Sequence, residues 1–160
     1  MAEVKGVDLD VLKDEIGEIS KQVIGQDNLA TSNPIFIVQQ KRRIGGMDPQ
    51  YTDDFYWVDF GGEVVDEEEL KYIEEILEKA GPYAEPEVPN YYKVYCTEIW
   101  EFVTACFTRH GCEEYIKANG HNLNEPRIYV DTGYRNREWE VMREFFKNYE
   151  RFVGSIKGGY

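Results

Sequence analysis

The sequence is poor in the residues that most often carry catalysis and metal binding. Its 160 residues include three cysteines, two histidines and three serines. It contains no phosphate-binding motif of the G-x-x-x-x-G-K-[ST] or G-x-G-x-x-G type. The G-x-S-x-G motif of a serine nucleophile is also missing. These absences argue against phosphate-loop enzymes and serine hydrolases, so we lean towards a protein that is not an enzyme.

Cysteine and histidine come close together at one place only. Cys106, His110 and Cys112 are neighbours in the sequence, but they lack C-x-x-C or H-x-x-x-H spacing and have no obvious fourth ligand. We therefore expect no metal and no cofactor. A cysteine- or metal-dependent enzyme near His110 is kept as a third hypothesis. The odd number of cysteines fits a reducing compartment.

Long apolar runs are missing as well. The longest, such as 35–38, extend over only a few residues, far fewer than a membrane span needs. The first residues lack the basic and apolar regions of a signal peptide. We therefore expect a protein in the cytoplasm, with no membrane contact.

The composition predicts a folded α+β protein. Apolar residues make up 42% of the chain and aromatic residues 14%, enough to fill a core within a single domain, 1–160. Helical periodicity is present at 8–24, 66–80, 108–116 and 136–152. Strand-like composition is present at 35–43, 55–60, 91–107 and 127–130. We predict a mostly antiparallel sheet of about four to five strands packed with about four helices.

The connections between these segments allow a more detailed expectation. Gly45 and Gly46 indicate a turn, so the strands 35–43 and 55–60 are expected to form a hairpin. The segment 91–107 is long enough for two strands that meet near 97–101. The strand and helix half of the chain is expected to cover 91–153, and the tail 154–160 to fray.

The helix 66–80 has the clearest signals. Asp66 and Glu69 have the spacing of a capping box at its start, and Gly81 with Pro82 ends it. Its apolar residues recur every three or four positions and predict a buried stripe of Leu70, Ile73, Ile76, Leu77 and Ala80.

Negative charge is concentrated in one region. The chain carries a net charge of −13, and residues 48–87 hold 14 acids against two lysines. Such a block sets up a directional field that attracts a basic partner and repels nucleic acid. We therefore expect a basic protein surface as the partner, and no direct binding of nucleic acid.

The exposed acids of this region define what we call the acidic face. Neighbouring carboxylates on a helix are spaced on a scale similar to that of phosphates along a nucleic-acid strand, so the face could occupy a groove built for DNA or RNA. The simpler alternative is that these acids only keep the helix soluble. The acidic face comprises Asp53, Asp54, Asp59, Glu67, Glu68, Glu74, Glu75 and Glu78.

A different region supports a second functional hypothesis. Gly133 precedes a predicted helix start, amid Arg127, Arg135 and Arg137. Free N–H groups at a helix start, with guanidinium groups nearby, can hold an anion such as a nucleotide phosphate. The alternative is that these arginines pair with acids of the chain itself.

One part of the sequence resembles a known group. Three motifs carry the resemblance: EYIKANGHNL at 114–123, PRIYV at 126–130 and GYRN at 133–136. Through them the segment 107–146, about a quarter of the chain, resembles small proteins of phages and prophages. The resemblance implies a phage-type origin. With the acidic face, it suggests an inhibitor of a host defence enzyme, of the anti-CRISPR or anti-restriction type.

Overall fold

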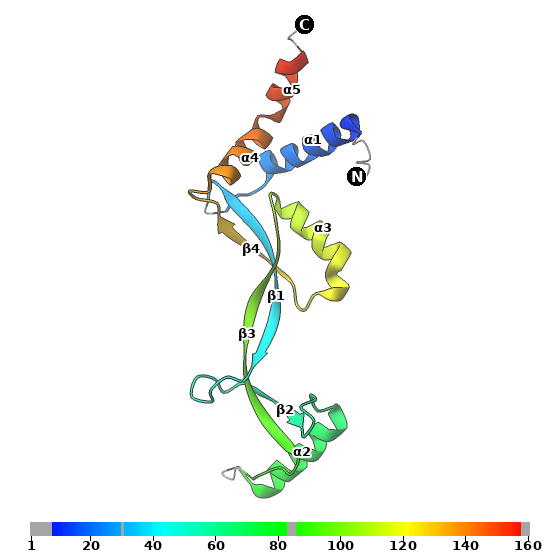
Figure 1. The fold of residues 1–160 in the computed structure, drawn as a ribbon, viewed down its shortest axis with the longest axis vertical. Helices are drawn as coiled ribbons and strands as arrows, with labels where there is room; N and C mark the ends of the chain where they lie inside the picture. The colour runs from blue at the N-terminus through cyan, green and yellow to red at the C-terminus, as the bar shows by residue number, and fades with distance from the viewer. Residues whose placement is uncertain (1–7, 30, 83–85, 158–160) are drawn as a thin grey trace, which may run out of the picture. The chain divides into compact units, whose positions relative to one another are not determined.

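The computed structural model describes residues 8–29, 31–82 and 86–157. In this part, helices alternate irregularly with strands (Figure 1). None of the described helices is both long and apolar enough to cross a membrane. In chain order the elements are α1 (Leu9–Gly25), β1 (Pro34–Gly45), β2 (Phe55–Asp59), α2 (Glu67–Ala80), β3 (Tyr91–Cys106), α3 (Arg109–Asn119), the short 3-10 helix η1 (Gly120–Asn122), β4 (Arg127–Thr132), α4 (Arg137–Lys147) and α5 (Tyr149–Lys157).

The four strands form one antiparallel sheet in the order β2-β3-β1-β4, which confirms the α+β prediction. Phe36 of β1 faces Val130 of β4, and Trp57 of β2 faces Lys93 of β3. The expected hairpin of β1 with β2 is wrong, because β3 lies between these two strands. The connection after β1 is also bonded to β3, since the N–H of Met47 donates to the carbonyl of Tyr95.

The segment 91–107 contains one strand, not the expected two. β3 extends over 16 residues without interruption. It contains no glycine, proline, asparagine or aspartate, so nothing in it favours a turn near 97–101.

The residues of the chain pack into two compact units. Unit 1 comprises 1–40 and 101–160, and unit 2 comprises 41–100. The core of unit 1 contains the fully buried Phe36, Val38 and Cys112. The core of unit 2 centres on Trp57, Ile73 and Val88. The single sheet therefore contributes to two hydrophobic cores.

In unit 1, α1 lies against α4 (Figure 1). Its predicted bounds, 8–24, agree closely with the observed Leu9–Gly25, and Asp8 caps it. Val23 is buried, and the hydroxyl of buried Ser20 donates to the carbonyl of Phe146 in α4. These contacts hold the second half of α1 on the aromatic face of α4.

A buried arginine connects several segments of unit 1. Arg143 of α4 is fully buried. Its guanidinium donates to the carbonyls of Pro34 and Phe107 at 3.4 and 3.3 Å, and to the side-chain oxygen of Asn28 at 3.2 Å. Burial lowers the pKa of Arg143. One side chain thereby joins α4 to the α1–β1 connection, the start of β1 and the residue after β3.

The expected last helix, 136–152, is divided into two. Asn136 caps α4 as predicted, by accepting a bond from the N–H of Trp139 at 3.1 Å. The helix ends at Asn148, whose N–H donates back to the last turn of α4. The expected frayed tail, 154–160, is helical as far as Lys157, and 158–160 lie outside the described residues.

Candidate partner-binding surface

The start of α2 forms as its sequence predicts. The carboxylate of Asp66 accepts bonds from the N–H groups of Glu68 and Glu69 at 3.0 and 2.9 Å. Glu69 completes the capping box by accepting the N–H of Asp66 at 3.0 Å. Glutamates in the first turn also suit the positive end of the helix dipole. The cap therefore fixes where the acidic helix begins.

One side of α2 is anchored in the core of unit 2. Ile73 is fully buried, and Ile76 and Leu77 pack beside it. Leu70 and Ala80, which the periodicity placed in the same stripe, are exposed instead. The anchored stripe leaves five glutamates of the acidic face exposed on the rest of the helix: Glu67, Glu68, Glu74, Glu75 and Glu78.

The three aspartates of the acidic face lie near β2. Asp53 and Asp54 are exposed just before the strand, and the carbonyl of Asp54 accepts the N–H of Cys96 at 2.9 Å. Asp59 ends the strand, about 17 Å further along. The three aspartates of the acidic face therefore lie at the two ends of β2 and do not form one contiguous patch.

Asp59 has a structural role in its turn. It is only half-exposed, and its carboxylate accepts the N–H of Glu63 at 2.9 Å. Its backbone N–H donates to the carbonyl of Glu63 at the same distance. The carboxylate of Asp59 is thus engaged in the structure of its own turn.

Charge is divided unevenly between the units. Residues 41–100 hold 15 acids and 6 bases, a net charge of −9, while the other 100 residues hold 16 acids and 12 bases, a net charge of −4. Two of the bases of unit 2 engage an acid of β3: Lys41 and Arg43 lie 3.4 and 3.9 Å from Glu98. On α2 itself, six glutamates outnumber the two lysines, Lys71 and Lys79.

Unit 2 also contains an aromatic pocket of about 350 Å³ that the sequence analysis missed. It lies where the start of β3 meets β2, the end of α2 and the connector before β3. The only signal in the sequence was the density of tyrosines at 91–95. Its lining includes Trp57, Glu87, Tyr91, Tyr92, Lys93 and Tyr95.

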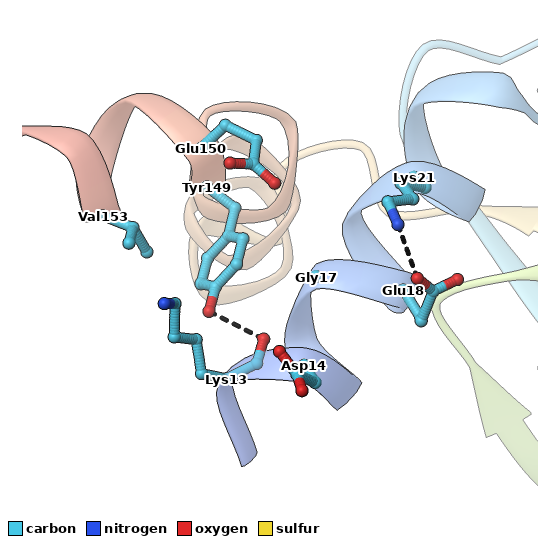
Figure 2. A pocket seen from close by; sticks show the side chains of 8 residues that line it. All are labelled: Lys13, Asp14, Gly17, Glu18, Lys21, Tyr149, Glu150 and Val153. Atoms are coloured by element: carbon cyan, nitrogen blue, oxygen red, sulfur yellow. Dashed lines mark hydrogen bonds and ion pairs between the residues drawn. The ribbon is translucent and has the colours of Figure 1, made fainter. Parts of the chain in front are cut away.

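A second pocket, of about 300 Å³, lies in unit 1 between α1 and α5 (Figure 2). The hydroxyl of Tyr149 points across it and donates to the carbonyl of Lys13 at 2.9 Å. Lys21 pairs with Glu18 at 2.6 Å, and this hydrogen bond is the main reason for the raised pKa of Lys21. The bond from Tyr149 joins α5 to α1, and the Lys21–Glu18 pair lies within α1, so these contacts do not indicate a ligand.

The residues of the predicted anion site belong to unit 1. Gly133 is buried, and its N–H donates to the carbonyl of Asn33 at 2.7 Å. A Cβ at Gly133 would lie 2.5 Å from the ring of Trp139, so the position needs glycine for this close approach. The first turn of α4 carries Glu138 and Glu140. Packing of the turn therefore explains the glycine.

The three arginines of that hypothesis have contacts of their own. Arg127 donates to the side chain of Gln39 at 2.9 Å. Arg135 lies over the ring of Tyr134, and Arg137 lies 3.8 Å from Glu140. Each arginine therefore has a partner within unit 1, and for Arg137 that partner is an acid.

The cysteine region has little nucleophilic character. Cys112 is fully buried, and burial, followed by the neighbouring Cys106, raises the pKa of its thiol to about 12. A thiol with such a pKa is protonated at neutral pH and reacts slowly. His110 is exposed. Within 8–29, 31–82 and 86–157, no group of three or more His, Cys, Asp or Glu residues is placed to hold a metal ion.

Comparison with known proteins adds no relative. No protein-family model, no curated protein and no solved structure matches the chain.

Proposed function

We propose that the protein is a non-enzymatic binding protein whose acidic face engages a basic protein surface. The partner we propose is a nucleic-acid-processing or defence enzyme of a bacterial host, and the face would occupy the groove in which that enzyme binds DNA or RNA. The protein would then act as an inhibitor of the anti-CRISPR or anti-restriction type.

The observation that supports this proposal most strongly is the arrangement of α2. Five glutamates are exposed on a helix whose start is fixed by a capping box and whose inner stripe is anchored by Ile73. Glu78 lies three and four positions after Glu75 and Glu74, a spacing that puts Cβ atoms about 5–6 Å apart, while Glu67 and Glu68 precede them with Lys71 between. We offer this group of carboxylates as a mimic of the closely spaced phosphates of a nucleic-acid strand.

The uneven charge favours a partner over simple solubility. A protein that needed only to stay soluble could spread its acids evenly, whereas unit 2 carries −9 in 60 residues and unit 1 carries −4 in 100. A concentrated field of one sign speeds association with a basic surface and selects against acidic ones. The resemblance of 107–146 to phage proteins supports a host defence enzyme as that surface.

A charge-reversal variant tests the proposal. Glu74, Glu75 and Glu78 are exposed in the last turns of α2, where lysine suits the helix dipole, so their replacement by lysine should leave the fold intact. The control carries the same change at exposed acids of α1: Asp14, Glu15 and Glu18. Wild type and both variants are immobilised and exposed to bacterial lysate, and captured proteins are identified and assayed for DNA binding.

We expect wild type and the α1 control to capture a basic protein and to compete with DNA for it. The α2 variant should bind about tenfold to hundredfold more weakly at ~0.1 M salt, because three attractions become three repulsions. Raising the salt should weaken the wild-type complex and shrink this difference. Equal capture by all three proteins, or a captured partner that still binds DNA normally, would contradict the proposal.

A further inference from the structure

The aromatic pocket of unit 2 has the composition of a site for a cationic side chain. The rings of Trp57 in β2 and of Tyr91 and Tyr95 in β3 lie on the same face of the sheet as Lys93 and contribute to its lining, whereas Tyr92 alternates to the opposite face. The faces of aromatic rings attract cations, most strongly when several rings converge and water is partly excluded. The connector before β3 adds Glu87, an exposed carboxylate that suits the same charge.

The wall of this pocket already holds a cation. The ammonium of Lys93 lies 4.5 Å from the ring centroid of Phe55 and 5.5 Å from that of Trp57. The two rings stand almost perpendicular, at 87°, with their centroids 6.0 Å apart. Lys93 therefore shows that a positive group is accommodated over these rings. It is an exposed side chain on a flexible stem, so it can move aside.

The charge around the pocket decides what could replace Lys93. Leu77 of α2 also lines the pocket, which places it beside the helix that carries the exposed glutamates. An anionic ligand would be repelled by the −9 of unit 2. Among cationic side chains, the guanidinium of arginine is planar, stacks on aromatic rings and sheds its water more readily than an ammonium.

We propose that the aromatic pocket receives an arginine side chain of the basic partner, which displaces Lys93 from Trp57 and is held between the tyrosines and Glu87. This inference rests on the proposed function and names the anchor of that interface. Arginine, tryptophan and tyrosine are the residues that most often dominate the binding energy of protein interfaces. The α2 glutamates would then steer the partner, and the pocket would select arginine over lysine.

Two peptides of equal charge separate these roles. Fluorescent nona-arginine and nona-lysine are titrated with the full chain, and binding is followed by fluorescence anisotropy at fixed low salt. For wild type we expect nona-arginine to bind about three- to tenfold more tightly than nona-lysine, because only guanidinium groups stack well on the rings. The measured quantity is this ratio of affinities, since charge alone affects both peptides alike.

Variants of the pocket should change the ratio, and matched variants outside it should not. Tyr95→Ala removes a half-buried ring of the pocket, and its control is Tyr56→Ala, a half-buried ring of β2 that does not line the pocket. We expect Tyr95→Ala to bring the ratio close to one and Tyr56→Ala to preserve it. Lys93→Met should raise the ratio about two- to fivefold by removing the competing ammonium. Its control is Lys71→Met, at an exposed position of α2, which should raise the affinity for both peptides equally.

The outcomes distinguish the pocket from the acidic face. If Tyr95→Ala and Lys93→Met leave the ratio at its wild-type value while lysines at Glu74, Glu75 and Glu78 weaken both peptides, the pocket inference is wrong and the proposed function stands. If neither peptide binds wild type, both are wrong. A ratio near one in wild type would also overturn the choice of arginine.

Discussion

Units 1 and 2 differ in where their polar side chains lie. Within the described residues, the buried polar side chains Ser20, Thr108 and Arg143 all belong to unit 1. Each hydrogen-bonds to a segment far away in the sequence. The buried residues of unit 2 are apolar, and its α2 glutamates face solvent. Polar groups thus contribute to the internal structure of unit 1 and to the surface of unit 2.

The difference bears on what mutation can separate. Buried polar groups are costly to leave without partners, so changes at the polar positions of unit 1 should alter stability. Exposed charges contribute little to stability, so changes on the α2 surface should alter binding alone. Three pairs of variants test how far this division holds.

The largest effect is expected at the buried arginine of unit 1. Arg143→Ala removes one of the two side-chain donors to each of the carbonyls of Pro34 and Phe107, and it opens a cavity among packed side chains. We expect the free energy of unfolding to fall by about 3–5 kcal/mol. Urea denaturation followed by circular dichroism measures it.

The control lies on the same helix. Arg137 has a side chain that is 84% exposed, so Arg137→Ala should change stability by no more than about 0.5 kcal/mol. Arg143→Met, which retains most of the volume, should give an intermediate loss. Equal losses for Arg143→Ala and Arg137→Ala would mean that the internal polar network of unit 1 contributes nothing.

A smaller effect is expected in the core of unit 2. Ile73→Ala removes a fully buried side chain that packs with Trp57 and Val88, and should cost about 2–5 kcal/mol. Leu70 occupies the same helix but is 38% exposed, so Leu70→Ala should cost below about 1 kcal/mol. Hydrogen exchange of the β2 and β3 amides reports the loss where it occurs. Similar costs at both positions would show that the helix packs differently from this description.

Leu70 also shows the limit of what the sequence pattern can predict. Periodicity identified the helix, its cap and Ile73 correctly, because these depend on residues close together in the chain. Periodicity could not show that Leu70 is exposed while Ile73 is buried, because burial depends on how far the core surface that α2 packs against extends. The hairpin error has the same origin: local turn signals were present at Gly45 and Gly46, but β3, far along the chain, supplies the strand beside β2.

The sites divide in a similar way. The exposed glutamates of α2 followed from the helical pattern alone. The aromatic pocket did not, since Trp57 lies beside Lys93 and the tyrosines of β3 only through the pairing of β2 with β3. The role of Arg143 could not be predicted either. An arginine in an amphipathic helix is usually exposed, and the acceptors of Arg143 come from three distant segments.

The smallest effect concerns exposed ion pairs, which should matter little in either unit. The Lys147 ammonium lies 2.7 Å from Glu144 in α4, while Lys79 lies 4.0 Å from Glu75 in α2. The hydrogen bond from Lys147, and then its charge, lower the pKa of Glu144. Since the glutamate is 61% exposed, solvent screening limits the pair to about 0.2–0.5 kcal/mol.

The sign of the pH dependence follows from that lowered pKa. A carboxyl whose pKa is lower in the folded state stabilises the fold above its unfolded pKa, near 4.3, and loses this contribution as the pH falls through its folded pKa. Lys147→Ala should therefore cost a few tenths of a kcal/mol at pH 7, and the cost should vanish at acid pH. Lys79→Ala, across the longer distance, should cost less at pH 7. Urea denaturation at pH 7 and pH 3 measures both variants, and a Lys147→Ala cost that persists at pH 3 would assign the loss to packing of the lysine stem instead of its charge.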